Sequence, residues 1–321
     1  LSLMTLGWLS MIGQPYVYKF LWAPLLDRYH FPRPDHRRGW VVVMQFFLML
    51  GLSLLALGSP QSFPVMMAIF AFCVAFLSAT QDIAIDAYRT ELLAPEERGL
   101  GSALFNSGYQ LGTILSGGIA LILASYFGWR AAYFLMAGLM LFSMIFTWWV
   151  PQAVKDKPKA VRGNIALVAW KNLLEQPHIV KILLFVVLYK VGDAFTLCLS
   201  TAFYLRELHF SLAFIGSTNK LIGITAAILG GLSAGFLLAK ISLYRGLMVF
   251  GLLQALCSFL FMLLASIGKN TALFFVTVFA DNFTSGMSGA ALVAFLTSLC
   301  NKRFSASQFA VLTAVMAIVR A

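Results

Sequence analysis

The sequence predicts an all-α protein, a polytopic bundle of transmembrane helices. Hydrophobic residues make up 60% of the 321 residues, charged residues only 11%, and the mean hydropathy is +0.86. Soluble domains carry about 25% charged residues. The apolar residues come in stretches of about 20, the length that a helix needs to cross the hydrocarbon core. A transmembrane β-barrel would need strands of only about 10 residues, so the stretches indicate helices.

Nine complete spans and one truncated span are predicted. They cover residues 3–25, 40–58, 64–87, 100–125, 131–150, 181–204, 213–239, 246–267 and 273–299, with the truncated span starting at 307. The chain begins with LSLMTLGW, inside an apolar segment and without an initiator Met, and it ends partway through another. No signal peptide is visible. We therefore expect a fragment of a longer chain that lacks the first and last helices.

The longest polar interval, residues 151–180, predicts a linker between two halves. It contains the charged run VKDKPKAVRGN, whose proline and glycine favour a flexible segment. Residues 1–150 would form an N-terminal half with about five of six helices. Residues 181–321 would form a C-terminal half with four complete helices and part of a fifth. A weak internal repeat supports this division, because PLLDRY…RRGWVV in the first half is matched by GFLLAKISLYRGLMV in the second.

The net charge of +11 lies in short loops between apolar stretches, which argues against a nucleic-acid partner. Fifteen loop lysines and arginines lie in loops of one parity, and only Arg130, Arg206 and Lys269 lie in the others. The positive-inside bias therefore places the first set in the cytoplasm and predicts a multi-pass protein of the lipid bilayer. The four cysteines form no CxxC pair and the four histidines are scattered. We expect no disulfide, no metal and no cofactor.

Charged side chains inside the spans predict a proton-coupling site. Asp82 and Asp86 are four residues apart, so they share one face of a helix, and Lys19 lies at a comparable depth. Charges inside a membrane are costly unless they are paired or face a cavity. Burial favours the neutral form of a carboxyl group and a nearby cation favours the charged form, so such a group can be poised to exchange a proton. A permanent structural ion pair is the alternative, and it stays open. The full set of buried charges is Lys19, Asp82, Asp86, Lys190, Asp193, Lys220 and Asp281.

Polar and amphipathic side chains within the spans predict a binding site for a glycan. Amide groups hydrogen-bond to sugar hydroxyls and flat aromatic rings stack on sugar rings, and amides in lipid require partners. A single tyrosine can instead anchor a helix at the membrane interface, and Lys190 can simply pair with Asp193 on its own helix. The candidate binding residues are Gln14, Tyr16, Gln81, Asn106, Tyr109, Gln110, Lys190, Asn219 and Asn282.

Four segments carry a family resemblance. The turn with Asp27-Arg28 and Arg37-Arg38-Gly39 resembles the cytoplasmic turn of the major facilitator superfamily. The stretches GQPYVYKFLWAPLLDRY (13–29), SATQDIAIDAYRTELLAPEERGLGSA (78–103) and GYQLGTILSGG (108–118) are similar to AmpG-type muropeptide permeases. The resemblance implies two pseudo-symmetric six-helix halves. It also implies proton-driven import of N-acetylglucosamine–anhydro-N-acetylmuramic acid, with or without peptide, across a bacterial inner membrane for cell-wall recycling.

The resemblance further implies a gate at the cytoplasmic turns. In the superfamily, the aspartate of this turn interacts with an arginine and a helix terminus, and we expect Arg89 to be the partner of Asp27. Solvated loop charges that only set topology are the alternative for part of the set. The gate candidates are Asp27, Arg28, Arg37, Arg38, Arg89, Glu96, Glu97 and Arg98.

Two other functions stay open from the sequence. Another facilitator of the same fold would carry a sugar, a drug or an acylated cofactor. A membrane-embedded enzyme would use the buried aspartates for acid–base work, but the sequence offers neither a nucleophile–base pair nor a cluster of metal ligands. We therefore predict a transporter that works by alternating access as a monomer, and not an enzyme.

Overall fold

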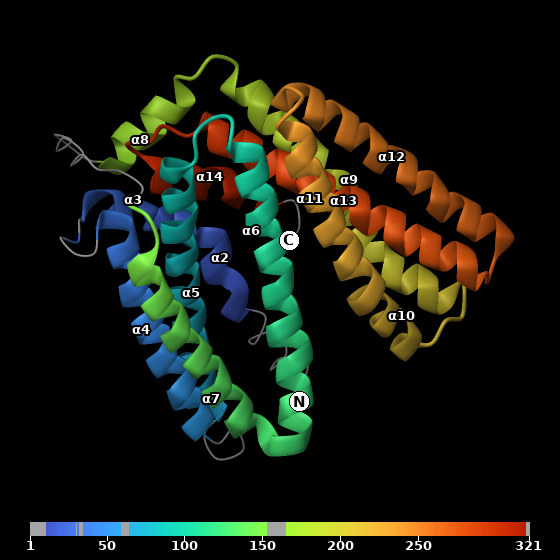
Figure 1. Ribbon diagram of the computed structural model, residues 1–321, viewed down its shortest axis with the longest axis horizontal. Coiled ribbons are helices and arrows are strands. Elements are labelled where there is room, and N and C mark those ends of the chain that lie inside the picture. Colours follow the sequence, from blue (N-terminus) through green and yellow to red (C-terminus); the bar gives the residue numbers. More distant parts are fainter. Residues whose placement is uncertain (1–10, 30, 32–34, 59–63, 153–164, 319–321) are drawn as a thin grey trace. The chain divides into compact units, whose positions relative to one another are not determined.

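The computed structural model describes residues 11–29, 31, 35–58, 64–152 and 165–318. These residues form helices joined by short turns and loops and contain no strand, as Figure 1 shows. The predicted all-α class is confirmed.

The first described segment consists of short helices in place of one long span. Its elements are η1 (Met11–Gly13), α2 (Gln14–Tyr18), η2 (Lys19–Leu21) and α3 (Ala23–Arg28). Proline lies in the first turn of α2 and of α3, at Pro15 and Pro24. Proline lacks a backbone N–H and clashes with the preceding helical turn, so it starts helices and interrupts longer ones. The prediction of one continuous helix over 3–25 is wrong for residues 11–25, and residues 3–10 lie outside the described residues.

The next helices follow the predicted spans closely. They are α4 (His36–Leu57), α5 (Pro64–Leu92), α6 (Arg98–Ile114), the π-helical η3 (Leu115–Ile119) and α7 (Ala120–Trp149). Gly128 lies within α7 at φ +81°, where the helix bends sharply. Only glycine adopts this conformation without strain. The bend therefore divides the continuous helical segment Arg98–Trp149 into the two predicted spans.

The remaining helices begin with α8 (Ile165–Leu174), which lies within the predicted linker. They continue with α9 (Ile179–Arg206), α10 (Leu212–Thr218), the π-helical η4 (Asn219–Gly223), α11 (Ile224–Leu238), α12 (Leu243–Ile267), α13 (Thr271–Leu299) and α14 (Ser305–Ile318). Each long helix agrees with a predicted span to within a few residues at its ends, which is the usual uncertainty of helix boundaries.

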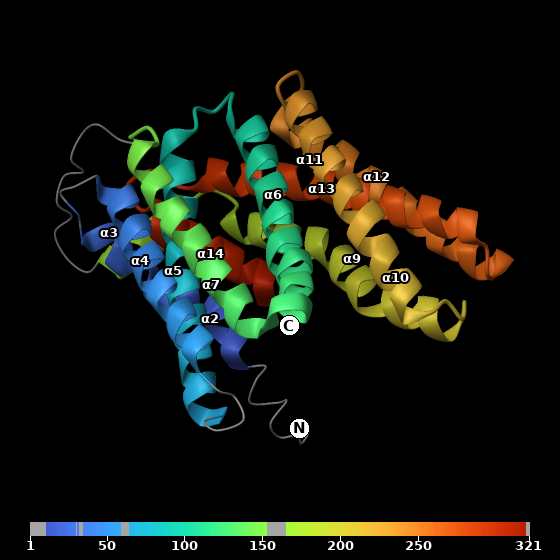
Figure 2. The ribbon, with the colours of Figure 1, turned by 60° about the horizontal axis from the view of Figure 1, so that its bottom comes forward.

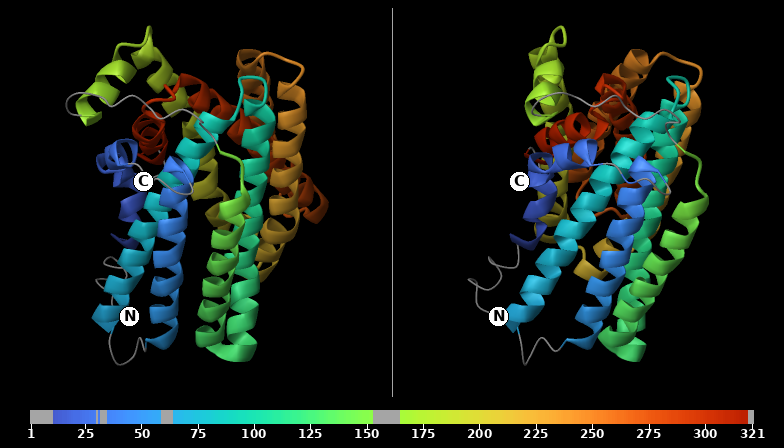
Figure 3. Two further views of the ribbon diagram at one scale, coloured as in Figure 1. Left: turned by 60° about the vertical axis from the view of Figure 1, so that its left-hand side comes forward. Right: turned by 90° about the vertical axis from the view of Figure 1, so that its left-hand side faces the viewer.

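By packing, the described chain forms two compact units. The first contains residues up to Leu92, Leu115–Ile179 and Cys300–Ile318, and the second contains Leu93–Ile114 and Val180–Leu299. In the first unit α4 packs against α5 and α7, as Figure 2 shows, and α8 lies beside α14 (Figure 3). In the second unit α11 and α13 pack on each other and on α6. Each unit draws on residues from both sides of the linker, and the division into two sequence halves stays a prediction.

The cores of the two units differ in character. The core of the first unit is built from small and aliphatic side chains, including Ala84, Ala87 and Ala306. The core of the second unit is aromatic, with Tyr204, Phe210 and Phe274 at its centre. Small residues let the helix backbones of the first unit approach closely, which positions the charged side chains described below.

Six described helical segments are long and apolar enough to cross a membrane. They are His36–Leu57, Pro64–Leu92, Arg98–Trp149, Ile179–Arg206, Leu212–Leu238 and Leu243–Ile267. The bent segment Arg98–Trp149 has 52 residues, enough for two crossings. The helix α13, predicted as a span, is long enough but is not among the six, and its middle carries Asp281, Asn282 and Thr284. Exposed side chains such as Phe142, Phe259 and Met262 give these helices apolar outer faces.

Candidate functional site

A row of side chains with alternating charges lies in the first unit between η2 and α5. The Lys19 Nζ atom lies 2.5 Å from Oδ2 of Asp82 and 3.6 Å from Oδ2 of Asp86. The other oxygen of Asp86 accepts a hydrogen bond from Arg89 Nη2 at 3.0 Å. Two cations therefore balance two carboxylates. We call this set the Lys19 cluster.

The local helix geometry explains the Lys19 cluster. Asp82, Asp86 and Arg89 are four and three residues apart, so one face of α5 presents all three. Lys19 lies on the short helix η2 and is only 5% exposed. A lysine this deep is stabilised by its carboxylate partners, because an unpaired buried charge would be costly. The predicted pairing of Lys19 with the carboxylates is present in the structure.

The two carboxylates of the Lys19 cluster differ in access. The side chain of Asp82 is 36% exposed and that of Asp86 is 8% exposed. Two hydrogen bonds join the first described segment to α5 within about one turn before Asp82. Trp22 Nε1 donates to Thr80 Oγ1 at 3.1 Å, and Tyr16 Oη donates to Ser78 Oγ at 2.6 Å. Asp82 is thus the carboxylate that water reaches more readily.

A second buried network in the first unit centres on Arg37. Its Nη2 atom donates to Oδ1 of Asp27 at 2.6 Å, its Nε atom donates to Oε1 of Glu91 at 2.7 Å, and its Nη1 atom donates to the carbonyl of Leu26 at 3.0 Å. The side chains of Arg37, Asp27 and Glu91 are all buried. The guanidinium thus joins the N-terminal end of α4 to α3 and to the C-terminal end of α5.

The same network holds the beginning of α14. Oδ2 of Asp27 accepts from the backbone N–H of Ser307 at 2.9 Å and from its hydroxyl at 2.5 Å. The hydroxyl of Ser305 donates to Oε1 of Glu91 at 2.5 Å and accepts from Arg37 Nη2 at 2.9 Å. The first backbone N–H groups of a helix have no intrahelical partner and carry partial positive charge, so carboxylates stabilise them. We call Asp27, Arg37, Glu91, Ser305 and Ser307 the Arg37 network.

The prediction that Arg89 is the partner of Asp27 is wrong. Asp27 pairs with Arg37, whereas Arg89 pairs with Asp86 and lies over the ring of Phe309, 5.1 Å from the centroid. Sequence reasoning also missed Glu91 and the two serines of α14. Serine is preferred at the start of a helix, where its oxygen meets free N–H groups. The pattern SAS at the start of the last span was therefore the available signal.

The other gate candidates lie outside the Arg37 network. Arg38 pairs with Asp35 at 2.5 Å and donates to the carbonyl of Val150 at 2.5 Å, which ties α4 to the end of α7. Arg28 and Glu96 are exposed. Oε2 of Glu97 accepts from the backbone N–H of Ala94 at 3.1 Å, within the turn before α6. Residues Glu96, Glu97 and Arg98 belong to the second unit.

The helix α8 of the linker holds the beginning of α14 by polar contacts. The buried amide of Gln308 donates to the carbonyl of Ala169 at 3.2 Å and to Oδ1 of Asn172 at 3.0 Å. Its Oε1 atom accepts from the backbone N–H of Asn301 at 2.7 Å. All these residues belong to the first unit. The linker therefore contains a structured helix bound to the same segment that Asp27 holds.

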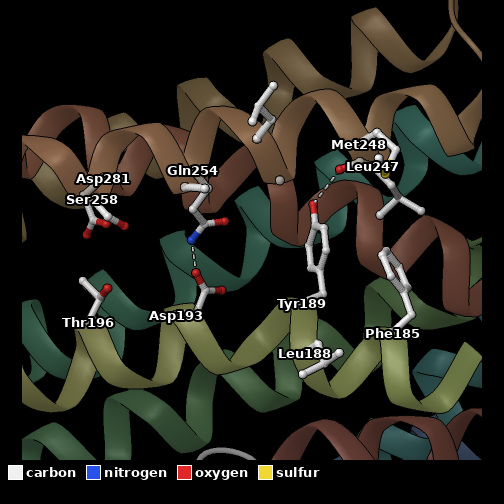
Figure 4. A pocket seen from close by; sticks show the side chains of 14 residues that line it. Phe185, Leu188, Tyr189, Asp193, Thr196, Leu247, Met248, Gln254, Ser258 and Asp281 are labelled. Atoms are coloured by element: carbon white, nitrogen blue, oxygen red, sulfur yellow. Dashed lines mark hydrogen bonds between the residues drawn. The ribbon is translucent and has the colours of Figure 1, made fainter. Parts of the chain in front are cut away.

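In the second unit, Lys190 and Asp193 form an ion pair on α9, and Gln254 of α12 donates to the same carboxylate. Asp193 and Asp281 line a cavity of about 390 Å³ between α9, α12 and α13, shown in Figure 4. The pairing alternative for Lys190 is thus present. Among the described residues, no three His, Cys, Asp or Glu side chains gather as metal ligands.

The candidate glycan-binding residues are distributed over both units. In the first unit, Gln14 and Tyr16 are exposed and Gln81 is half-buried next to Asp82. In the second unit, Tyr109 is exposed on α6 and Asn282 donates to the carbonyl of Val278 at 2.8 Å. The rest of the set lies in the second unit, with Asn106, Gln110 and Asn219 half-buried and the charge candidate Lys220 exposed. A common binding surface for this set stays a prediction.

Comparison with known proteins gives the family. A sequence model described as Major Facilitator Superfamily matches residues 1–321. The chain belongs to the major facilitator superfamily. Among solved structures, the fucose–proton symporter FucP in the outward conformation covers 100% of this chain with a TM-score of 0.73 and 13% identity, with 82% of its own length matched. The proton–xylose symporter XylE covers 100% with a TM-score of 0.72 and 14% identity, with 78% of its length matched. These similarities show a shared fold.

Curated relatives are more similar in sequence. The anhydromuropeptide permease of Escherichia coli K12 is 40% identical over 322 residues, which include 100% of this chain and 66% of the permease. AmpG 3 of Rickettsia typhi, whose name describes a transporter, is 31% identical over 98% of this chain and 78% of its own length. The predicted resemblance to AmpG-type proteins is confirmed. The chain spans just under two thirds of the Escherichia coli permease.

The fold, the apolar helices and the family together support the predicted localisation. Six described segments are suited to crossing a membrane, and the relatives named above are bacterial transport proteins. The chain is therefore a multi-pass inner-membrane protein.

Proposed function

We propose that this chain forms most of a proton-driven secondary transporter that imports anhydromuropeptides across a bacterial inner membrane. The observation that carries the proposal is the 40% identity to an anhydromuropeptide permease over every residue of the chain. Transporters of this superfamily work by alternating access, with the substrate near the bilayer midplane between two repeats. The proposed partners are an amino-sugar glycan, with or without peptide, and protons, and the protein acts as a monomer with two six-helix halves.

The Lys19 cluster is the proposed proton site. Asp82 and Asp86 lie on one helix face and share the ammonium group of Lys19. Asp82 is the more exposed of the two and receives the proton, while Asp86 keeps Arg89 as a partner. Protonation of Asp82 leaves Lys19 with one carboxylate, and this change in local charge drives the conformational step.

The Arg37 network is the proposed cytoplasmic gate. It ties α14, which follows the linker, to Asp27 and Glu91, which precede it. Rocking of one half against the other requires that such contacts break and form again. The gate is closed when Asp27 holds the first N–H groups of α14, and opens when α14 leaves.

Uptake in cells tests the function. The full-length protein is expressed in bacteria that lack their own anhydromuropeptide permease, and accumulation of labelled N-acetylglucosamine–anhydro-N-acetylmuramic acid is measured with and without a protonophore. We expect accumulation that the protonophore abolishes. Asp82→Asn should abolish accumulation but retain exchange of labelled for unlabelled substrate. The matched control is Glu175→Gln, which removes an exposed carboxylate of the first unit.

Each alternative function has its own outcome in this assay. Uptake of a free sugar, a drug or an acylated cofactor without uptake of the anhydromuropeptide would assign another cargo. Chemical conversion of the substrate by purified protein in detergent would indicate an enzyme. Accumulation that persists in the Asp82→Asn variant and still collapses with the protonophore would place the proton site elsewhere.

A further inference from the structure

The cavity of the second unit has one polar end and one apolar end. In Figure 4, Thr196, Ser258 and Asp281 lie at one end, and Phe185 and Leu247 lie at the other. The cavity volume of about 390 Å³ falls within the range of about 300–1,000 Å³ that is typical of small-molecule sites. A space of this size and shape fits an amphipathic molecule much larger than a single ion.

The charge balance of the cavity is negative. Lys190 and Gln254 both bind the carboxylate of Asp193, so the charge of Lys190 is already neutralised. In the part of the chain that the structure describes, the carboxylate of Asp281 has no hydrogen-bond donor and no ion pair. Asp281 is half-buried in the central part of α13, where a carboxylate without a partner is costly. A cation bound beside Asp281 would offset this cost.

The position of Asp193 and Asp281 along their helices indicates whether a cation in the cavity comes from water or from a lipid headgroup. Asp193 lies near the middle of α9 and Asp281 lies in the central part of α13, both helices of almost 30 residues. Lipid headgroups lie at the ends of membrane-spanning helices, about 15 Å from the midplane. A ligand for this cavity therefore comes from water and not from a lipid headgroup.

We propose that this cavity binds a small organic cation, with a primary ammonium group at Asp281 and an apolar body against the opposite end. The hydroxyls of Thr196 and Ser258 line the same end and supply oxygen acceptors for the remaining ammonium hydrogens. The apolar body lies against Phe185 and Leu247. The sequence suggested that Lys190 binds a carboxylate of the substrate, but the Lys190–Asp193 ion pair leaves a site for the opposite charge.

Isothermal titration of the full-length protein in phosphatidylcholine nanodiscs tests this proposal. The probe is 2-phenylethylammonium, and the controls are the neutral 2-phenylethanol and the anionic 3-phenylpropionate. A charge-assisted hydrogen bond makes the ammonium bind at least ~10-fold tighter than the alcohol. Asp281→Asn should abolish that preference. Glu207→Gln, which removes an exposed carboxylate of the same unit, should keep it.

Thermal unfolding separates loss of the site from loss of the fold. Removing an unpartnered carboxylate should leave the Tm of Asp281→Asn at or above that of the parent protein. The ammonium probe should raise the Tm of the parent and not that of the variant. If Asp281→Asn does not fold, Ser258→Ala should weaken ammonium binding ~3-fold or more without weakening the alcohol. Equal affinities for ammonium and alcohol, or an undiminished preference in Asp281→Asn, would overturn the proposal.

The result does not depend on the cargo. Binding of the ammonium probe is measured without anhydromuropeptide, so it can succeed or fail whatever the uptake assay finds. Retrieval of phosphatidylethanolamine with the purified protein, together with ammonium binding that disappears in phosphatidylethanolamine nanodiscs, would assign the cavity to a lipid headgroup and contradict the argument from depth.

Discussion

Replacement of Arg37 by methionine should strongly destabilise the first unit. Arg37 is 3% exposed and donates to Asp27, to Glu91 and to a backbone carbonyl. Methionine keeps the length of the apolar stem but removes the charge and every donor. In the parent protein, Nη2 of Arg37 lies 2.6 Å from an oxygen of Asp27 and 2.6 Å from an oxygen of Glu91. The substitution leaves both buried carboxylates without this cation.

The expected size of the effect follows from this burial. Removing one partner of a buried ion pair costs about 3–5 kcal/mol, because the remaining charges are left uncompensated. One kcal/mol corresponds to about 2–4 °C in Tm for a unit of 150–250 residues. Arg37→Met should therefore lower the Tm by about 10 °C.

Tryptophan fluorescence during heating of the full-length protein in detergent measures this change. The matched control is Arg28→Met, which removes an exposed arginine from the same turn. Arg37→Met combined with Glu91→Gln should recover part of the loss, since one uncompensated charge is removed. If Arg37→Met melts within about 2 °C of the Arg28→Met control, the network does not stabilise the fold as argued.

Three further perturbations test separate contacts. Gln308→Leu should lower the Tm by a few degrees, because the polar groups that Gln308 binds on α8 would stay buried without a hydrogen bond, at a cost of about 1–3 kcal/mol. An unchanged Tm would mean that α8 does not hold α14. Gly286→Ala should lower the Tm more than Gly289→Ala, because a side chain at Gly286 meets the backbone of α11 whereas Gly289 faces open space; equal melting would refute this close approach. A double-mutant cycle of Asp86→Asn and Phe309→Leu should give a coupling of about 0.5–3 kcal/mol in unfolding free energy, and additive effects would exclude a link between the Lys19 cluster and α14.

Helix positions were predictable from the sequence because lipid imposes a length on each apolar stretch. The ends of α4, α9 and α12 lie within a few residues of the predicted spans. The prediction failed at 11–25, where two prolines divide one apolar stretch into short helices. Hydropathy alone counts apolar residues and does not register the missing N–H groups of proline.

The Lys19 cluster was predictable because charges within a span require partners. The spans contain few cations, and Lys19 lies at a depth comparable to Asp82 and Asp86, so the choice of partners was small. The Arg37 network offered many more choices. Several arginines lie near the cytoplasmic turns, and sequence spacing does not say which of them reaches Asp27. Ser307, its other partner, is 280 residues away in the sequence, and only the folded chain brings the two together.

The positions of the two networks suggest how proton uptake reaches the gate. A single helix, α5, carries Asp86 and Arg89 of the Lys19 cluster and Glu91 of the Arg37 network. Arg89 binds Asp86 on one side and lies over Phe309 of α14 on the other. In the mechanism that we propose, a proton on Asp82 leaves Asp86 to balance both Lys19 and Arg89. The bond from Asp86 to Arg89 then weakens, and the contact of Arg89 with Phe309 changes. Coupling of this kind needs an element with two arrangements that both sites bias. We propose α14 for this role, because Arg89 of the Lys19 cluster and the Arg37 network both contact it.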